Sequence, residues 1–302
     1  MGNGEKKKIF LAKERGFCSG VKNALALVEK VLAEEEKKVF VLHEIVHNDA
    51  IVHALREKGV IFIDEPEEAG NGDVLIFSAH GVSQNVEKRA VALCGKIVDA
   101  TCPIVKKLHR TAEDFEKRDL QILLLGKKGH RETEGIAGRV KRKVTILQDL
   151  SEVKVFLEKL SSHEKENVYW GCLSQTTMSA SEVENMKQIL SSVLAHLEIP
   201  ASVCYATKER QDAVKDLAEK CDIVFVAGSE KSSNSRRLVE IVRESGKESM
   251  LVPDPENFIL PDLSEYESIG ITSGASAPEY HVEKLIRLLE ETGNFYLVKE
   301  EK

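Results

Sequence analysis

Short apolar runs alternate with amphipathic helical patterns along most of the chain. The runs are four to seven residues long and rich in Val, Ile and Leu, which is typical of strands buried in parallel sheets. The pattern predicts twelve strands, at residues 8–12, 39–42, 60–63, 73–78, 96–101, 120–126, 144–147, 168–174, 201–204, 223–229, 249–252 and 269–274.

The stretches between several of these strands carry helical periodicity. Apolar residues from Val21 to Leu32 recur on one face of a helix. Segment 179–197 opens with Ser179 and has Glu182 three residues later, a capping-box pattern that predicts the start of a helix. Alternation of strands and helices throughout the chain predicts an α/β fold.

Three cysteines divide the sequence into similar parts. Cys18, Cys102 and Cys204 each follow an apolar run and precede a helical pattern, the last of them over residues 209–219. Two polar clusters follow each cysteine at similar spacings, and they begin at His43, Gly126 and Gly228 and at Ser78, Ser174 and Thr272. Because most of these clusters fall at the carboxyl ends of predicted strands, where α/β sheets place their ligand sites, we expect them to line a binding site.

This repeat predicts three similar α/β domains with small, mostly parallel sheets of four strands each. The strand count is met only if the first apolar run joins the last domain. We therefore expect domains over residues 19–101, 102–200 and 201–302 plus 1–18.

Composition and charge narrow the class of protein. The chain has 302 residues, 43 Lys plus Arg, 50 Asp plus Glu and a net charge of −7, so a large contact with a nucleic-acid backbone is not expected. No apolar run reaches the length of a membrane span, and residues 1–16 lack the apolar core of a signal peptide. These features predict a cytoplasmic protein, in which the six cysteines serve as thiols or metal ligands rather than disulfides.

The three repeated cysteines are candidate metal ligands. Each precedes a predicted helix, and a thiol at a helix N-terminus favours the thiolate. Three thiolates from three domains would make a soft site that selects zinc, Cu(I) or an iron–sulfur cluster. The other cysteines break the repeat and are interpreted as small buried apolar residues; they are Cys94, Cys172 and Cys221.

The polar clusters carry candidate ligands for a small anion such as a phosphate or diphosphate. Histidines and hydroxyl or amide side chains gather there, namely His47, His80, His130, Ser232, Ser233, Asn234 and Ser276. Asn234 and Ser276 also fit the N-cap position of a helix. Glu132 is a candidate proton donor, although spacing alone favours an ordinary surface carboxylate, and Thr176 is unexceptional by itself. A zinc hydrolase and a phosphate-binding module without catalysis are the alternatives.

Nine motifs in order resemble those of the 4-hydroxy-3-methylbut-2-enyl diphosphate reductases of the non-mevalonate isoprenoid pathway. They cover nearly the whole chain and read RGFCSGV, HEIVHN, FSAHGVS, VDATCP, GHRETEG, SQTT, CYAT, SSNS and SGASAP. The resemblance implies three α/β domains in a pseudo-threefold arrangement around a central 4Fe-4S cluster.

The resemblance also implies roles for individual residues. The cluster ligands would be Cys18, Cys102 and Cys204, which leave the fourth iron open to the allylic hydroxyl of the substrate. The diphosphate ligands would be His47, His80, His130, Ser232, Ser233, Asn234 and Ser276. Glu132 would deliver a proton, and Thr176 would orient or relay it.

The implied reaction is a reductive dehydroxylation that consumes two electrons and two protons and gives isopentenyl or dimethylallyl diphosphate. Ferredoxin or flavodoxin is the expected electron donor. The family usually has His-Pro-Glu where this chain has His130-Arg131-Glu132, and Arg131 does not restrict the backbone as proline does.

Overall fold

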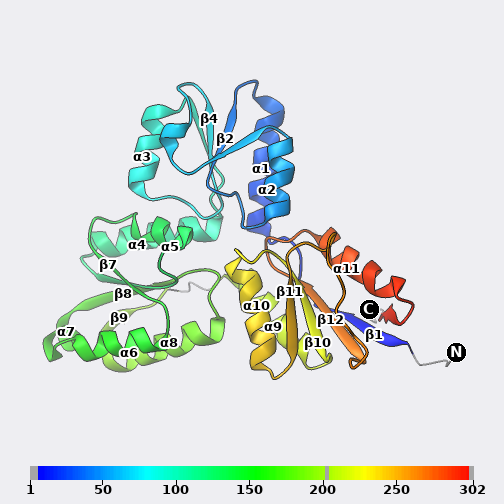
Figure 1. The fold of residues 1–302 in the computed structure, drawn as a ribbon. Helices are drawn as coiled ribbons and strands as arrows, with labels where there is room; N and C mark the ends of the chain where they lie inside the picture. Colours follow the sequence, from blue (N-terminus) through cyan, green and yellow to red (C-terminus); the bar gives the residue numbers. More distant parts are fainter. Residues whose placement is uncertain (1–5, 201–203, 299–302) are drawn as a thin grey trace. The chain divides into compact units, whose positions relative to one another are not determined.

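The computed structural model describes residues 6–200 and 204–298. The chain forms two compact units. One contains the described parts of residues 1–18, 47–50 and 205–302, and the other contains those of residues 19–46 and 51–204. Three separate parallel sheets organise the chain (Figure 1).

The first sheet is made of four strands in the order β3-β2-β4-β5. Their bounds are β2 Val39–Leu42, β3 Val60–Ile63, β4 Val74–Phe77 and β5 Lys96–Asp99. The helices of this part of the chain are α1 Ser19–Glu34, α2 Asp49–Glu57, the 3-10 helix η1 Pro66–Glu68 and α3 Gln84–Leu93. Strands β2 and β4 are buried along their whole length.

The second sheet has the order β7-β6-β8-β9. Its strands are β6 Gln121–Leu125, β7 Val144–Leu147, β8 Tyr169–Ser174 and β9 His196–Glu198. The accompanying helices are α4 Pro103–Lys117, α5 Arg131–Ala137, α6 Leu150–Lys159, α7 Ser162–Asn167 and α8 Ala180–Val193.

The third sheet has five strands in the order β11-β10-β12-β1-β13. They are β1 Lys7–Leu11, β10 Ile223–Ala227, β11 Glu248–Val252, β12 Ser268–Ser273 and β13 Phe295–Leu297, with helices α9 Tyr205–Ala218, α10 Ser233–Glu244 and α11 Glu279–Glu291. Because β1 pairs with β12 and β13 in parallel, the first strand of the chain lies in a sheet with strands more than 200 residues later in the sequence.

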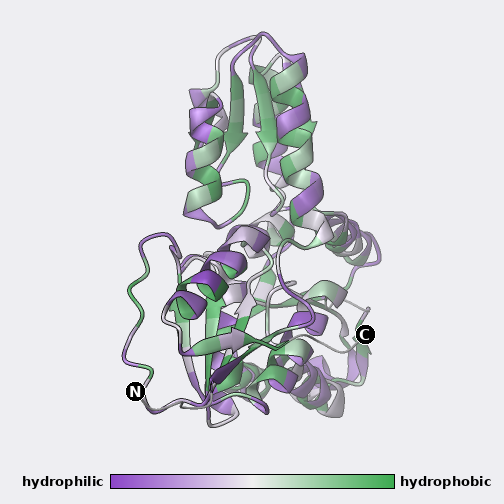
Figure 2. Cartoon of the chain, turned by 90° about the vertical axis from the view of Figure 1, so that its right-hand side faces the viewer, coloured by the Kyte–Doolittle hydropathy of each residue, from purple (hydrophilic) through white to green (hydrophobic). Residues whose placement is uncertain are grey.

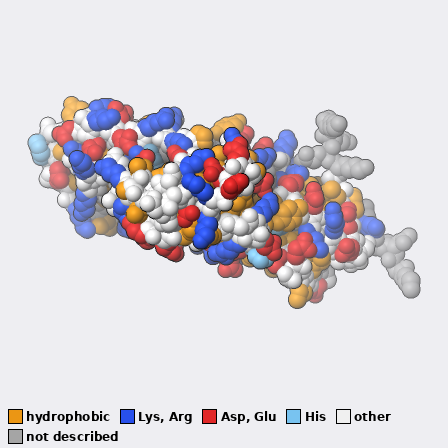
Figure 3. All heavy atoms as spheres, turned by 90° about the horizontal axis from the view of Figure 1, so that it is seen from above, with side chains coloured by type: hydrophobic (Ala, Val, Ile, Leu, Met, Phe, Trp, Pro, Cys, Tyr) orange, Lys and Arg blue, Asp and Glu red, His pale blue; other side chains and the backbone are white. Residues whose placement is uncertain are grey.

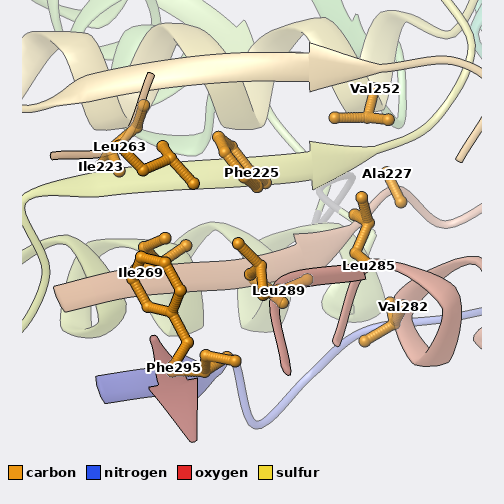
Figure 4. Packing of buried hydrophobic residues seen from close by; sticks show 12 residues of the cluster. Ile223, Phe225, Ala227, Val252, Leu263, Ile269, Val282, Leu285, Leu289 and Phe295 are labelled. Atoms are coloured by element: carbon orange, nitrogen blue, oxygen red, sulfur yellow. The ribbon is translucent and has the colours of Figure 1, made fainter. Parts of the chain in front are cut away.

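The three sheets share one strand order. Strands β3-β2-β4-β5 correspond to β7-β6-β8-β9 and to β11-β10-β12-β1, so β1 takes the place of a fourth strand in the last sheet. Apolar side chains fill the layer between sheet and helices, as the cluster around Phe225, Leu285 and Leu289 illustrates (Figure 4). The strands are accordingly mostly hydrophobic, and the helices carry both hydrophobic and hydrophilic residues (Figure 2).

The predicted α/β class with three sheets is confirmed, with corrections in detail. The last sheet has a fifth strand, β13, that was not predicted, and the second sheet is completed by β9. Strand β9 contains Leu197, so the helix predicted over 179–197 is too long: α8 ends at Val193. For the predicted strand 201–204, residues 201–203 lie outside the described residues and Cys204 is not in a strand. The boundaries of the three domains stay a prediction.

Candidate active site

The polar clusters lie where ligand sites form in sheets of this type. They follow β2 and β4, β6 and β8, and β10 and β12, which are the second and third strands in the order of each sheet. In each sheet the chain continues to opposite sides from these two strands, and such a switch point opens a crevice at their carboxyl ends. The repeated clusters of the sequence therefore correspond to three equivalent sheet edges.

The repeated cysteines also occupy equivalent positions. Each follows the fourth strand of one sheet and directly precedes a helix: Cys18 precedes α1, Cys102 precedes α4 and Cys204 precedes α9. Cys102 is the N-cap of α4 and provides no side-chain cap. A serine at this position would make a capping hydrogen bond and stabilise the helix by about 1 kcal/mol. The Cys102 thiol does not make this bond.

The other cysteines differ in chemistry. Burial raises the pKa of Cys172 and of Cys221 to about 12, and it raises the pKa of Cys94 as well. These thiols stay protonated at neutral pH, which fits their interpretation as apolar residues. None of the six cysteines forms a disulfide.

Glu132 is a buried carboxyl with a defined partner. It lies in the first turn of α5 and is only 2 % exposed. The Thr176 backbone N–H donates to Oε1 at 2.7 Å, and the Thr176 hydroxyl donates to Oε2 at 2.7 Å. The interpretation of Glu132 as a surface carboxylate is therefore wrong, and Thr176, which follows β8, is its direct partner.

The environment of Glu132 favours the protonated carboxyl. Burial raises its pKa from the ordinary 4.5 to about 7, although the two hydrogen bonds from Thr176 act in the opposite direction. A carboxyl with a pKa near the working pH can both hold and release a proton. Glu132 thus has the properties of a general acid.

Two histidines lie beside this pair. His130 caps α5, because its Nδ1 accepts a hydrogen bond of 3.1 Å from the Glu132 N–H. Nδ1 is therefore unprotonated, and a neutral His130 carries its proton on Nε2. The His80 ring meets the His130 ring edge to face, with 6.0 Å between the ring centroids. The structure thus brings His80, His130, Glu132 and Thr176 together.

A second group of predicted residues lies on the unit that contains the third sheet. Ser232 caps α10 by accepting from the Ser235 N–H at 3.2 Å. The Ser276 hydroxyl lies 3.4 Å from the Ser232 Oγ and 3.3 Å from the His47 carbonyl oxygen. The segment that carries His47 is also held by an ion pair of 2.6 Å between Asp49 and Lys231.

Asn234 is the unusual member of this group. It is 4 % exposed, and neither its Oδ1 nor its Nδ2 has a hydrogen-bond partner among the described residues. A buried amide without partners is costly, and it lies in the first turn of α10, where backbone N–H groups favour an anion. Its unpaired atoms indicate that a polar ligand completes this site. The N-cap of α10 is Ser232 and that of α11 is Pro278, so the capping roles considered for Asn234 and Ser276 are wrong.

Comparisons with known proteins identify the family of the chain. The model of the LytB protein family matches residues 9–290. A 4-hydroxy-3-methylbut-2-enyl diphosphate reductase of Corynebacterium glutamicum is 41% identical over 95% of this chain and 88% of its own length, and one of Desulfotalea psychrophila is 39% identical over 98% and 93%. The chain belongs to this family of reductases. The predicted resemblance is thereby confirmed.

Solved structures of the family support the fold. The E-1-hydroxy-2-methyl-but-2-enyl-4-diphosphate reductase of Plasmodium falciparum is 31% identical, with a TM-score of 0.89 over 98% of this chain and 94% of that one. A second reductase structure, described as the terminal enzyme of the non-mevalonate pathway, has a TM-score of 0.66 and 28% identity over 94% of this chain and 99% of that one.

The departure from the family pattern at Arg131 leaves Glu132 in place. Arg131 is the first residue of α5, where proline is favoured but other residues are tolerated because the N–H needs no partner within the helix. Its guanidinium lies 3.7 Å from Glu134 and 3.8 Å from Asp64, and all three side chains are largely exposed. Such pairs contribute little, so His130 and Thr176 position Glu132.

Gln175 is a further residue that the sequence did not single out. It is 2 % exposed, its Oε1 accepts from the Lys127 N–H at 2.9 Å and the Thr133 hydroxyl at 3.2 Å, and its Nε2 donates to Thr177 at 2.8 Å. These bonds fasten the loop before Glu132 to the loop that carries Thr176. In the sequence, only its place within the SQTT motif indicated that Gln175 belongs to the site.

Gly81, next to His80, gives a testable packing constraint. Its φ is +75°, and a Cβ there would lie 2.6 Å from Cε1 of His109 and 3.0 Å from Cγ2 of Thr101, both buried. We expect Gly81→Ala to lower the free energy of unfolding by about 2–4 kcal/mol, because strain and overpacking add. Urea unfolding measures this loss.

Gly59→Ala is the matched control. Gly59 also has a positive φ, of +96°, but no atom in the described part of the chain lies within 4 Å of its added Cβ. Alanine there costs only backbone strain, on the order of 1 kcal/mol. Equal losses in the two variants would contradict the packing argument at Gly81.

Within residues 6–200 and 204–298, no three His, Cys, Asp or Glu side chains gather closely enough to hold a metal ion. The cysteine ligand set therefore stays a prediction. No helix in that same part of the chain combines the length and apolar character needed to cross a membrane.

Proposed function

We propose that the two groups of residues described above carry out the reaction of the reductase family. The substrate is 4-hydroxy-3-methylbut-2-enyl diphosphate, and the products are isopentenyl and dimethylallyl diphosphate, at the last step of the non-mevalonate isoprenoid pathway. In this reaction a C–O bond breaks, oxygen leaves as water, and two electrons and two protons are consumed. The observation that carries the proposal is the buried Glu132 carboxyl bonded to Thr176 in a chain of this family.

The cysteines suit the cofactor that the family implies. Cys18, Cys102 and Cys204 are three soft ligands at equivalent places in the fold, and Cys102 occupies an N-cap without making the capping bond. We assign them as ligands of a 4Fe-4S cluster. Once bound, this cluster supplies electrons and one iron that lacks a cysteine ligand and can act as a Lewis acid.

Protein side chains supply the proton and orient the groups that transfer it. Hydroxide is a poor leaving group, so Glu132 donates a proton to the departing oxygen. Thr176 orients the carboxyl through its N–H and hydroxyl, and the hydroxyl can pass the proton on. Burial of Glu132 keeps part of its population protonated at neutral pH.

The diphosphate is bound by neutral donors and histidines. We assign this role to His47, His80, His130, Ser232, Ser233, Asn234 and Ser276. The first turn of α10 adds backbone N–H groups and the positive end of a helix dipole. An acidic chain can bind a diphosphate in this way, because the donors are gathered locally and the net charge of the whole chain matters little.

Asn234→Leu tests the diphosphate site. Because the amide makes no bond in the described chain, we expect the melting temperature of the ligand-free protein not to fall. The dissociation constant for inorganic diphosphate should rise by about 10-fold or more, since hydrogen bonds to a charged group contribute roughly 1.5–3 kcal/mol each. Isothermal titration calorimetry measures the constant, and an unchanged value would reject Asn234 as a ligand.

Asn257→Leu serves as its control. Asn257 is exposed on the same unit, and its amide already donates to Asp254 at 2.7 Å. Diphosphate affinity should stay unchanged in this variant. A similar loss in both variants would show that the effect is not specific to the site.

Electron supply and location follow the sequence predictions. A ferredoxin or flavodoxin is the proposed donor, and the protein is proposed to be cytoplasmic. Acidic and basic side chains are intermixed on the face shown in Figure 3.

A further inference from the structure

Arg210 is a buried cation without a carboxylate partner. It lies on α9 and is 3 % exposed. Its Nη1 donates to the Ala206 carbonyl and its Nη2 to the Gly16 carbonyl, each at 2.8 Å. Its Nε has no partner within residues 6–200 and 204–298. No carboxylate pairs with it in the described part of the chain. Buried charges are normally paired, because desolvation of an isolated ion is costly.

The two carbonyls that Arg210 contacts lie next to two of the predicted cluster ligands. Gly16 precedes Cys18 by two residues, and Ala206 follows Cys204 by two. The Gly16 N–H donates to the Ser273 hydroxyl at 2.7 Å, and the Cys18 N–H donates to the Ala275 carbonyl at 3.2 Å. The hydrogen bond from Arg210 thus helps to hold the loop before Cys18.

Chain geometry limits how far the charge can lie from Cys18. Two residues span at most about 7 Å, and the guanidinium is hydrogen-bonded to the Gly16 carbonyl. The positive charge therefore lies within about 12 Å of the Cα of Cys18, by the reach of the chain. At that separation and in an effective dielectric of about 20, the attraction between a unit positive charge and an added electron changes the equilibrium constant for reduction by about tenfold.

We propose that Arg210 is the positioning and charge-balancing residue of the iron–sulfur cluster. This inference rests on the proposed function, since it requires the cluster that Cys18, Cys102 and Cys204 are assigned to hold. Three thiolates give the cluster region negative charge, and each electron taken up adds more. Arg210 offsets that charge, raises the reduction potential and keeps the loop of Cys18 in place.

Three variants separate these roles. Arg210→Gln removes the charge, and Arg210→Lys keeps the charge but lacks the planar fork that reaches two carbonyls. Arg15→Gln is the matched control: Arg15 is three residues from Cys18, but its charge is paired with Glu279 at 2.8 Å. For each anaerobically loaded protein, we would measure the iron content and the midpoint potential. Electron paramagnetic resonance monitors the cluster during the anaerobic redox titration that gives the potential.

We expect Arg210→Gln to make one-electron reduction of the cluster about tenfold less favourable. This change in the equilibrium constant lowers the midpoint potential by about 59 mV. Arg210→Lys should shift it by less than half as much, and Arg15→Gln should not shift it. Iron content should fall in both Arg210 variants, more strongly with glutamine. If glutamine prevents loading altogether while lysine permits it, the charge role is also supported.

An unchanged potential in iron-loaded Arg210→Gln would overturn the charge role, as would equal shifts with glutamine and lysine or complete loss of iron from both. Full iron content in both Arg210 variants would overturn the positioning role. These results are separate from a failure of the proposed function, which would show as absence of the cluster from the unaltered protein.

Discussion

Replacing Glu132 with glutamine is expected to lower kcat by about 10²–10⁴-fold, the usual contribution of general acid catalysis. Glutamine can still accept from the Thr176 N–H and donate to the Thr176 hydroxyl, so the local hydrogen bonds survive. Only the transferable proton is lost. Turnover with a chemically reduced donor measures the effect, and diphosphate affinity should remain within a few-fold.

Glu132→Gln is also expected to change the free energy of unfolding in a pH-dependent way. The folded pKa of Glu132, about 7, lies above its ordinary 4.5, so the carboxyl destabilises the fold increasingly as the pH rises through this interval. Glu132→Gln should therefore stabilise the ligand-free protein by up to about 3 kcal/mol at pH 8 and by less at pH 5.5. Urea unfolding at the two pH values measures the difference.

Glu134→Gln is the control for both effects. Glu134 lies two residues later on α5, its side chain is 53% exposed, and its carboxylate lies 3.7 Å from the Arg131 guanidinium. Turnover and stability should stay near those of the unaltered protein. Unchanged turnover in Glu132→Gln would reject Glu132 as the acid.

Replacing Cys102 with serine is expected to remove the cluster and abolish turnover. An alcohol does not ionise at neutral pH and is a poor ligand for iron in a sulfur-rich site. Serine is nevertheless a good N-cap, and Cys102 forms no capping bond, so the apo-protein should be as stable as before or more stable by about 1 kcal/mol. Iron content and thermal unfolding test both parts of this prediction.

Cys94→Ser provides the comparison. Cys94 follows α3, is half-buried, and has a pKa raised by burial. We expect this variant to keep its iron and its turnover. Retention of iron in Cys102→Ser, or loss of iron from both variants, would contradict the proposed ligand set.

The apolar pattern was sufficient to predict most of the fold. Central strands such as β2 and β10 are buried along their whole length and read as continuous apolar runs. The short strands β9 and β13 were not predicted, because each has only three residues and at least one exposed position. In β9, His196 and Glu198 are exposed, so no apolar run marks it.

The site was predictable only as a set of motifs. The sequence places Glu132 in a polar cluster, but its burial depends on Thr176, 44 residues away, and on the packing of two loops against each other through Gln175. Arg210 likewise bonds a carbonyl 194 residues away. Such contacts depend on tertiary structure, and neither periodicity nor spacing contains them.

Metal analysis and a product assay on one anaerobic preparation together test whether this chain is an iron–sulfur reductase. We expect a brown protein with about four irons and about four sulfides per chain, as a 4Fe-4S cluster requires. It should convert 4-hydroxy-3-methylbut-2-enyl diphosphate to isopentenyl and dimethylallyl diphosphate when a reduced donor is supplied. A colourless protein with one tightly bound zinc and no such conversion would contradict it.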